Sequence, residues 1–106
     1  RCILFRDAEG RYTGFEVKGH SGYAEAGSDI VCAAVSALVI NFVNSLDELT
    51  DDHYQIDVNQ EDAEIDVVFT EELSEEGSLL LRSLILGLTS VEEEHGQYLD
   101  VIFKEV

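Results

Sequence analysis

The sequence has no proline, and only 6 of its 106 residues are lysine or arginine. Without proline or a low-complexity stretch, a linker between domains is not expected, and the length suits one small domain spanning residues 1–106. No apolar run approaches the roughly 18 residues that a membrane-spanning helix needs. Hydrophobic residues make up 45% of the chain and charged residues 27%, which excludes a disordered tail. We therefore expect a single folded domain that is not a membrane protein.

The scarcity of basic residues gives the chain a strong charge of one sign. Against 23 aspartate and glutamate residues, the 6 basic residues leave a net charge of −17. Such a surface repels phosphate backbones and anionic lipids, so direct binding to nucleic acid or to a membrane is disfavoured. The same electric field attracts a positively charged molecule. The composition thus predicts a basic partner.

Cysteine is scarce as well, with only Cys2 and Cys32. A secreted domain of this size usually carries four or more cysteines, and no signal peptide is visible, although a first residue other than methionine indicates a trimmed start. These features favour a reducing, cytoplasmic setting. An even number of cysteines allows one disulfide between them, but a disulfide conflicts with a reducing compartment. Cys2, in a β-prone run beside Leu4, is expected in the core.

Apolar and polar residues alternate in five short runs, a pattern typical of strands. The first two runs are joined across an acidic turn that ends in glycine, and the third and fourth across another acidic turn, so each pair is expected to form a hairpin. The runs lie at residues 2–6, 12–18, 54–59, 63–69 and 98–104.

Two segments show helical spacing of apolar residues. The first is expected to begin with Ser28 or Asp29 as its N-cap, to end within residues 46–49 and to be mostly buried. The second begins at Ser74, has acidic residues in its first turn and ends at Gly96. The resulting order, ββαββαβ, predicts an α+β two-layer sandwich, with a mainly antiparallel five-stranded sheet and two helices on one face.

The residues with the clearest chemical meaning lie around the start of the first helix. Residues 19–27 contain three glycines in nine positions, which predicts a loop, and this loop carries His20. Cys32 is expected in the first turn of the helix that follows. A thiol attacks as the thiolate, and a helix N-terminus and an imidazole can both favour that form. Unpaired N–H groups of the helix end could also hold an oxyanion, so the pattern predicts a His–Cys pair for acyl transfer.

Other roles for these residues stay open on spacing alone. A cysteine among alanines and valines is commonly a packing residue, and a histidine in a glycine-rich loop is commonly solvated. His53 and His95 could join His20 and Cys32 around zinc, but no Cys-x-x-Cys or i, i+3 spacing supports such a site. No metal and no cofactor are therefore expected.

Residues 19–36 resemble a known family signature. The strings GHSGYAE, at residues 19–25, and GSDIVCAAVS, at residues 27–36, look like the motif of the ribosomal-processing cysteine protease family, Prp. The resemblance extends over the whole chain in length and element order. Ser21 departs from it, standing where alanine is common, but this position does not carry the chemistry.

The resemblance implies an endopeptidase that removes an N-terminal extension from large-subunit ribosomal protein twenty-seven through an acyl-enzyme intermediate. It implies that His20 is the general base and Cys32 the nucleophile. The supporting or substrate-binding positions of the motif are Gly19, Gly22, Asp29 and Ser36. A purely structural role stays open for Asp29 as a helix cap and for Ser36 as a donor to a backbone carbonyl.

A different class of function also fits the charge. An acidic, non-catalytic module that binds or chaperones a basic ribosomal protein would need neither the Cys32 thiolate nor His20. The protease hypothesis expects the N-terminal extension of a basic ribosomal protein as partner, and the binding-module hypothesis expects a basic ribosomal protein. Neither expects nucleic acid or a membrane. The oligomeric state is left open, with a homodimer as one alternative.

Overall fold

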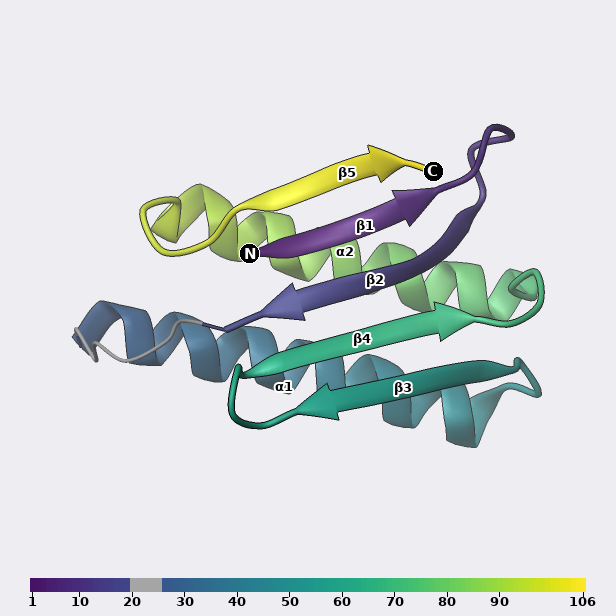
Figure 1. Ribbon diagram of the computed structural model, residues 1–106, viewed down its shortest axis with the longest axis horizontal. Helices are drawn as coiled ribbons and strands as arrows, with labels where there is room; N and C mark the ends of the chain where they lie inside the picture. Colours follow the sequence, from purple (N-terminus) through teal and green to yellow (C-terminus); the bar gives the residue numbers. More distant parts are fainter. Residues whose placement is uncertain (20–25) are drawn as a thin grey trace.

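The order of elements agrees with the sequence pattern. In the computed structural model, residues 1–19 and 26–106 are described, apart from the side chains of residues 26–28. Figure 1 shows the strands in front of the helices. The elements are β1 (Cys2–Arg6), β2 (Tyr12–Lys18), α1 (Ala26–Leu49), β3 (Tyr54–Asn59), β4 (Glu64–Phe69), α2 (Glu75–His95) and β5 (Val101–Glu105).

The five strands form one sheet in the order β3-β4-β2-β1-β5. Neighbouring strands are antiparallel except β1 and β5, which are parallel because α2 carries the chain from β4 across the sheet to the far edge. Both helices lie behind the same face of the sheet (Figure 1). The mixed but mainly antiparallel sheet and the two-layer arrangement confirm the predicted fold class.

The core lies between the sheet and the helices. Leu4, Phe15 and Val67 stand in one cross-strand row and are almost completely buried. Phe15 packs with Phe42 of α1 and with Phe69, at ring-centroid distances of 5.6 and 6.3 Å, in tilted geometries that aromatic rings favour. The buried side chains of the strands therefore all point to the helix side, as their alternation predicts.

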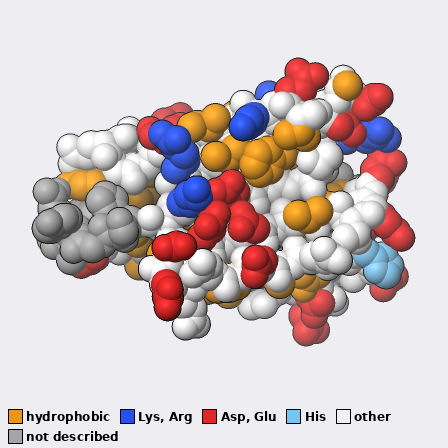
Figure 2. All heavy atoms as spheres, viewed as in Figure 1, with side chains coloured by type: hydrophobic (Ala, Val, Ile, Leu, Met, Phe, Trp, Pro, Cys, Tyr) orange, Lys and Arg blue, Asp and Glu red, His pale blue; other side chains and the backbone are white. Residues whose placement is uncertain are grey.

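The opposite face of the sheet is not covered by any helix of the described residues and is called the open face below. Figure 2 views the molecule from this side and shows a group of apolar side chains over β1 and β5, beside a group of acidic side chains over β2 and β4. This face is thus divided into two chemically different halves.

The first helix begins earlier than predicted. α1 starts at Ala26, so Ser28 and Asp29 lie in its first turn and are not its N-cap. A glycine costs most in a helix interior, so Gly27 near the end does not prevent the helix from starting before it. The helix is also less buried than expected: its inner stripe packs into the core, but Ile30 and Leu49 are 65% and 71% exposed.

α1 also corrects the expectation that no apolar run approaches the length of a membrane span. Its segment Asp29–Leu49, 21 residues long, is apolar enough to cross a membrane by length and composition. The serine and asparagine residues that interrupt the apolar pattern carry no charge, so the segment as a whole stays apolar enough for a membrane span. The core helix of a folded domain passes the same test, and here the stripe from Val31 to Leu46 is buried against the sheet. The segment is therefore weak grounds for a membrane span.

The second helix begins as predicted, with a support that the sequence did not indicate. The Ser74 side chain accepts a hydrogen bond from the Gly77 N–H at 3.0 Å, as an N-cap does. The Asp52 carboxylate in turn accepts hydrogen bonds from the Ser74 hydroxyl, at 2.8 Å, and from its N–H. At the other end of α2, the Tyr98 N–H closes a turn on the His95 carbonyl at 2.9 Å, so the last strand begins at Val101 and not at residue 98.

Candidate active site

Cys32 lies on the wall of a cavity of about 450 Å³ between α1 and the end of the sheet where β2 ends and β4 begins. Its side chain is half-buried, so the thiol is held by the fold and still reaches the cavity. The sheet contributes the apolar side chains of Val17, Val58 and Ile65 to the lining, together with the polar side chains of Lys18, Asn59 and Glu64. A peptide side chain could therefore be enclosed directly beside a thiol.

Two other residues of the predicted site lie on the same side of α1. Asp29 and Ser36 stand three residues before and four residues after Cys32, a spacing that places side chains together on a helix. Both line the same cavity. The structure thus brings together Asp29, Cys32 and Ser36, while His20 and Gly22 lie outside the described residues.

Gly19 also lines the cavity, and the structure shows why a glycine stands there. Its N–H donates a hydrogen bond of 2.7 Å to the Ala63 carbonyl, at the turn between β3 and β4. A Cβ atom at Gly19 would lie 2.8 Å from the Ala63 Cβ, closer than side-chain atoms pack. Ala63 itself has a positive φ of 50°. The close approach of these two segments therefore requires a residue without a side chain immediately before His20.

The position of Cys32 along α1 differs from the prediction. Because α1 begins at Ala26, Cys32 lies in its second turn and not in its first. The backbone N–H groups that lack a helical partner belong to the first four residues of a helix. The expectation that Cys32 lies in the first turn, among these unpaired N–H groups, is therefore wrong.

Cys2 lines the same cavity but is chemically very different. Its side chain is only 1% exposed, and burial raises the pKa of its thiol to about 11. In the described chain, no Cα atom of β1 lies within 8 Å of a Cα atom of α1. A disulfide requires a Cα–Cα distance below about 7 Å, so Cys2 and Cys32 cannot be bridged in this fold. Both are free thiols, and Cys2 is a core residue as expected.

The histidines that could have completed a zinc site lie elsewhere. His53 immediately precedes β3, and His95 is the last residue of α2. Neither of these two described histidines lines the cavity that holds Cys32. The fold therefore does not bring them to the cysteine.

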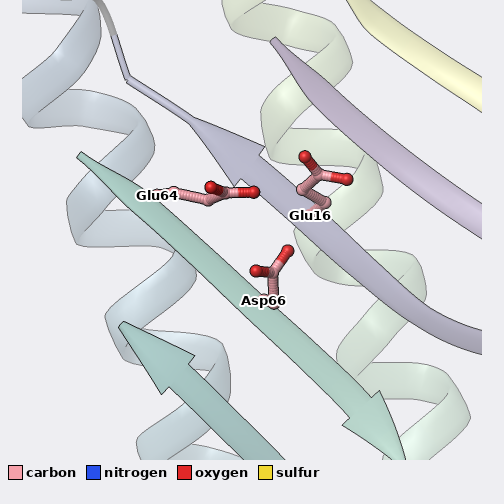
Figure 3. A group of neighbouring side chains, drawn as sticks. All are labelled: Glu16, Glu64 and Asp66. Atoms are coloured by element: carbon pink, nitrogen blue, oxygen red, sulfur yellow. The ribbon is translucent and has the colours of Figure 1, made fainter. Parts of the chain in front are cut away.

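A second group of titratable side chains lies on the open face. Carboxylate oxygens of Glu16, Glu64 and Asp66 come within 4.8 Å of one another, and Figure 3 shows the three side chains pointing toward a common point between β2 and β4. Burial, followed by the nearby Glu16 and Asp57, raises the pKa of Asp66. The pKa of Glu64 is raised as well, chiefly because its carboxyl shares a hydrogen bond with Glu16. Strand alternation indicates that each residue is on a polar face, but the sequence did not indicate that β2 pairs with β4.

These raised pKa values predict that removing one charge stabilises the fold. Since the folded state holds the Asp66 proton more tightly than the unfolded chain, this group contributes less stability as pH rises through its titration. At pH 7, Asp66→Asn should raise the free energy of unfolding by about 0.5 kcal/mol, and the melting temperature by about 3 °C. Thermal melts at several pH values would measure the difference from wild type, which should shrink as pH falls through the carboxyl range.

The control for this prediction is Glu71→Gln, which removes one exposed charge from the loop between β4 and α2. An equal gain in both variants would mean that the net charge of −17, and not the local crowding around Asp66, is responsible.

The chain is similar to known proteins over most of its length. The family described as cysteine protease Prp matches residues 1–100. The ribosomal processing cysteine protease Prp of Bacillus subtilis strain 168 is 32% identical over 91 residues, which cover 82% of this chain and 81% of the relative. The protein of the same name from Staphylococcus aureus strain Mu50 is 28% identical over 96 residues, or 91% of each chain.

A solved structure shares the fold as well. The crystal structure of Prp from S. aureus, in complex with a covalently linked product peptide, has a TM-score of 0.86 and 26% identity, and the match covers 97% of both chains. Together with the family match over residues 1–100 and the half-buried thiol beside a cavity, this shows the class of the protein. The chain belongs to the Prp family of cysteine proteases and is a cysteine protease of ribosomal processing.

Proposed function

We propose that this protein removes the N-terminal extension of large-subunit ribosomal protein twenty-seven during ribosome assembly. The observation that carries the proposal is the Cys32 thiol, half-buried on the wall of a 450 Å³ cavity in a chain of the Prp family. The net charge of −17 is a further support, because a protein that binds ribosomal RNA is basic and would be attracted to this surface.

In the proposed mechanism, His20 accepts the proton of the Cys32 thiol, and the Sγ atom attacks the carbonyl carbon of the scissile peptide bond. The tetrahedral intermediate collapses to a thioester as His20 donates that proton to the leaving amine. Water, deprotonated by His20, then hydrolyses the thioester and returns the thiol. The position of His20 lies outside the described residues. Its proposed role is supported by the GHSG motif at residues 19–22.

Asp29 and Ser36 are proposed as supporting residues of the same site. Both line the cavity with Cys32, where their polar side chains could contact a bound peptide. Asp29 also stands in the first turn of α1, where a carboxylate interacts favourably with the helix dipole. Its structural role and its supporting role are therefore compatible.

The cavity supports a peptide as substrate because its lining combines apolar and polar side chains. On one side, Val58 and Ile65 offer apolar surface for a side chain. On the side of α1, the polar groups of Asp29, Cys32 and Ser36 lie among the apolar side chains of Val31, Val35 and Val39. We propose that the residues next to the cleaved bond lie between these walls, with the scissile carbonyl at the Cys32 Sγ atom.

The experiment that tests this function is mass spectrometry of ribosomal protein twenty-seven, with its extension, after incubation with the enzyme. Wild type should shorten the substrate at one bond, and Cys32→Ala should leave it intact. Cys2→Ala, which removes the other thiol, is the matched control and should retain cleavage once a thermal melt confirms that it is folded. An intact substrate that binds wild type and Cys32→Ala equally would instead support the acidic binding module.

We also propose that the protein acts in the cytoplasm. Both cysteines are free thiols, which suits a reducing compartment, and bacterial ribosomes are assembled there. Fractionation of cells, with detection of this chain, would test the localisation. Sedimentation of the purified protein would decide whether it is a homodimer.

A further inference from the structure

The open face of the sheet has an organised surface that catalysis at Cys32 does not use. One cross-strand row runs over all five strands in the order Ile102, Ile3, Glu16, Asp66 and Asp57. The row is apolar on β5 and β1 and acidic on β2, β4 and β3, and Figure 2 shows these two halves side by side. A single extended or helical segment could therefore contact both.

The apolar half is partly exposed to solvent. Ile102 is 36% exposed, and Ile3 and Phe5 beside it on β1 are half-buried. In the row of Phe5, Lys104 of β5 is exposed and charged, Gly14 of β2 has no side chain, and Val68 of β4 is 52% exposed. Apolar side chains gathered on one face and bordered by charge are typical of a binding surface for another protein.

The acidic half keeps like charges in direct opposition. Asp66 stands opposite Glu16 on β2 and opposite Asp57 on β3. Lys18 contacts Glu16, with 3.2 Å between its Nζ and the carboxylate, so part of the negative charge is neutralised. Like charges at opposed cross-strand positions destabilise a sheet. A cation from another molecule, placed among these carboxylates, would relieve this repulsion.

The acidic half is also continuous with the active-site cavity. Glu64 belongs to the cluster with Glu16 and Asp66, and it lines the cavity that holds Cys32. Lys18, at the end of β2, lines that cavity too. A substrate chain that leaves the cavity over the ends of β2 and β4 therefore reaches the open face directly.

From this we infer that the open face docks a lysine- or arginine-rich segment of the processed ribosomal protein, outside the residues that enter the cavity. Its cationic side chains bind Glu16, Asp66 and Asp57, and its apolar side chains pack on Ile3 and Ile102. The charge complementarity between this acidic half and a basic substrate selects this occupant over a second copy of the chain, whose net charge is also −17. The inference rests on the proposed function for the identity of the segment.

The test measures binding separately from cleavage. Fluorescently labelled ribosomal protein twenty-seven with its extension is titrated with Cys32→Ala protein, with and without Glu16→Gln and Asp66→Asn, in buffer containing EDTA. Neither Glu16 nor Asp66 lines the cavity. We expect the Kd to rise about fivefold in the double variant, and less at high salt. In the Cys32 enzyme, the double variant should cleave a short peptide without lysine or arginine at the wild-type rate.

The matched control is the double variant Asp51→Asn/Glu71→Gln, which also removes two negative charges. Asp51 precedes β3 and Glu71 follows β4, at the end of these strands that does not line the cavity. We expect this pair to leave the Kd nearly unchanged. A second variant, Ile102→Ser, tests the apolar half and should weaken binding of the labelled protein but not cleavage of the short peptide. Both double variants should remain folded, since Asp66→Asn is expected to stabilise the sheet and the control pair changes only exposed side chains.

Four results would overturn the inference. An equal loss of affinity in both charge variants would mean long-range attraction without a docking surface, and an unchanged Kd in all variants would exclude the open face. Magnesium that raises the melting temperature of wild type, but not of Glu16→Gln/Asp66→Asn, would identify a metal site. Sedimentation of wild type as a dimer that Ile102→Ser dissociates would assign the face to a second copy.

If binding is lost as expected while wild type cleaves nothing, the proposed function fails and the docking surface stands.

Discussion

Iodoacetamide at pH 7.5 is expected to alkylate Cys32 at least about 100-fold faster than Cys2. The thiolate is the reactive form, and with a pKa of about 11 Cys2 is almost entirely protonated at this pH. An ordinary exposed thiol, by comparison, is roughly one tenth ionised. Burial adds a second barrier, because Cys2 is 1% exposed whereas Cys32 is half-buried and faces a cavity. Mass spectrometry of peptides after timed labelling would give both rates.

The same measurement tests the proposed base. If His20 accepts the proton of Cys32, His20→Ala should slow labelling of Cys32 near neutral pH and leave Cys2 unchanged. His53→Ala is the matched control, because His53 lies before β3 and away from the cavity. Equal rates at the two cysteines would contradict the assignment of Cys32 as the reactive thiol. A labelling rate of Cys32 that is the same in His20→Ala as in wild type would contradict the proposed His20–Cys32 pair.

Cys32→Ala is expected to lower kcat for cleavage of the ribosomal protein by at least about 10⁴-fold. Removing a nucleophile removes the covalent route entirely, and the activity left comes from binding and polarisation of the substrate alone. His20→Ala should cost about 10²- to 10⁴-fold, the usual contribution of a general base. KM should change little in either variant, because the walls around Val58 and Ile65 remain. Initial rates over a range of substrate concentrations would separate the two constants.

A serine variant separates the chemistry of the Cys32 thiol from the presence of a polar group at that position. Cys32→Ser keeps a hydroxyl where the Sγ atom stood but should be nearly as inactive as Cys32→Ala, because a serine hydroxyl needs a stronger base for activation. An acyl-enzyme trapped by rapid acid quench should appear in wild type and in neither variant. Cleavage that survives in Cys32→Ala, with the second thiol removed by Cys2→Ala, would overturn a cysteine nucleophile in this chain.

Local patterns in the sequence were sufficient for much of the fold. The alternation of apolar residues located both hairpins, and the spacing from Val31 to Leu46 located the inner face of α1. Side chains three and four residues apart share a helix face whatever the helix packs against, so the shared position of Asp29, Cys32 and Ser36 also followed. The Ser74 cap followed from the preference of serine at helix starts.

The errors lie where a local signal competes with its surroundings. Gly27 and the candidate caps after it indicated a helix start that the structure places earlier, at Ala26, and this moved Cys32 out of the first turn. Ile56 and Val58 alternate as core residues do, yet both are exposed, because β3 is at the edge of the sheet. Periodicity indicates which face a side chain is on, but the neighbouring elements decide whether that face is covered.

What this sequence determined by itself is the set of elements, their inner faces and the residues that share a turn of helix, because these depend on contacts within a few residues. Only the tertiary structure decided that β4 pairs with β2 and β5 with β1, since those registers join segments far apart in the chain. The cavity at Cys32, the burial of Cys2 and the opposition of Glu16 and Asp66 all follow from those pairings. Each is a property of two or more elements in contact, and no single segment carries it.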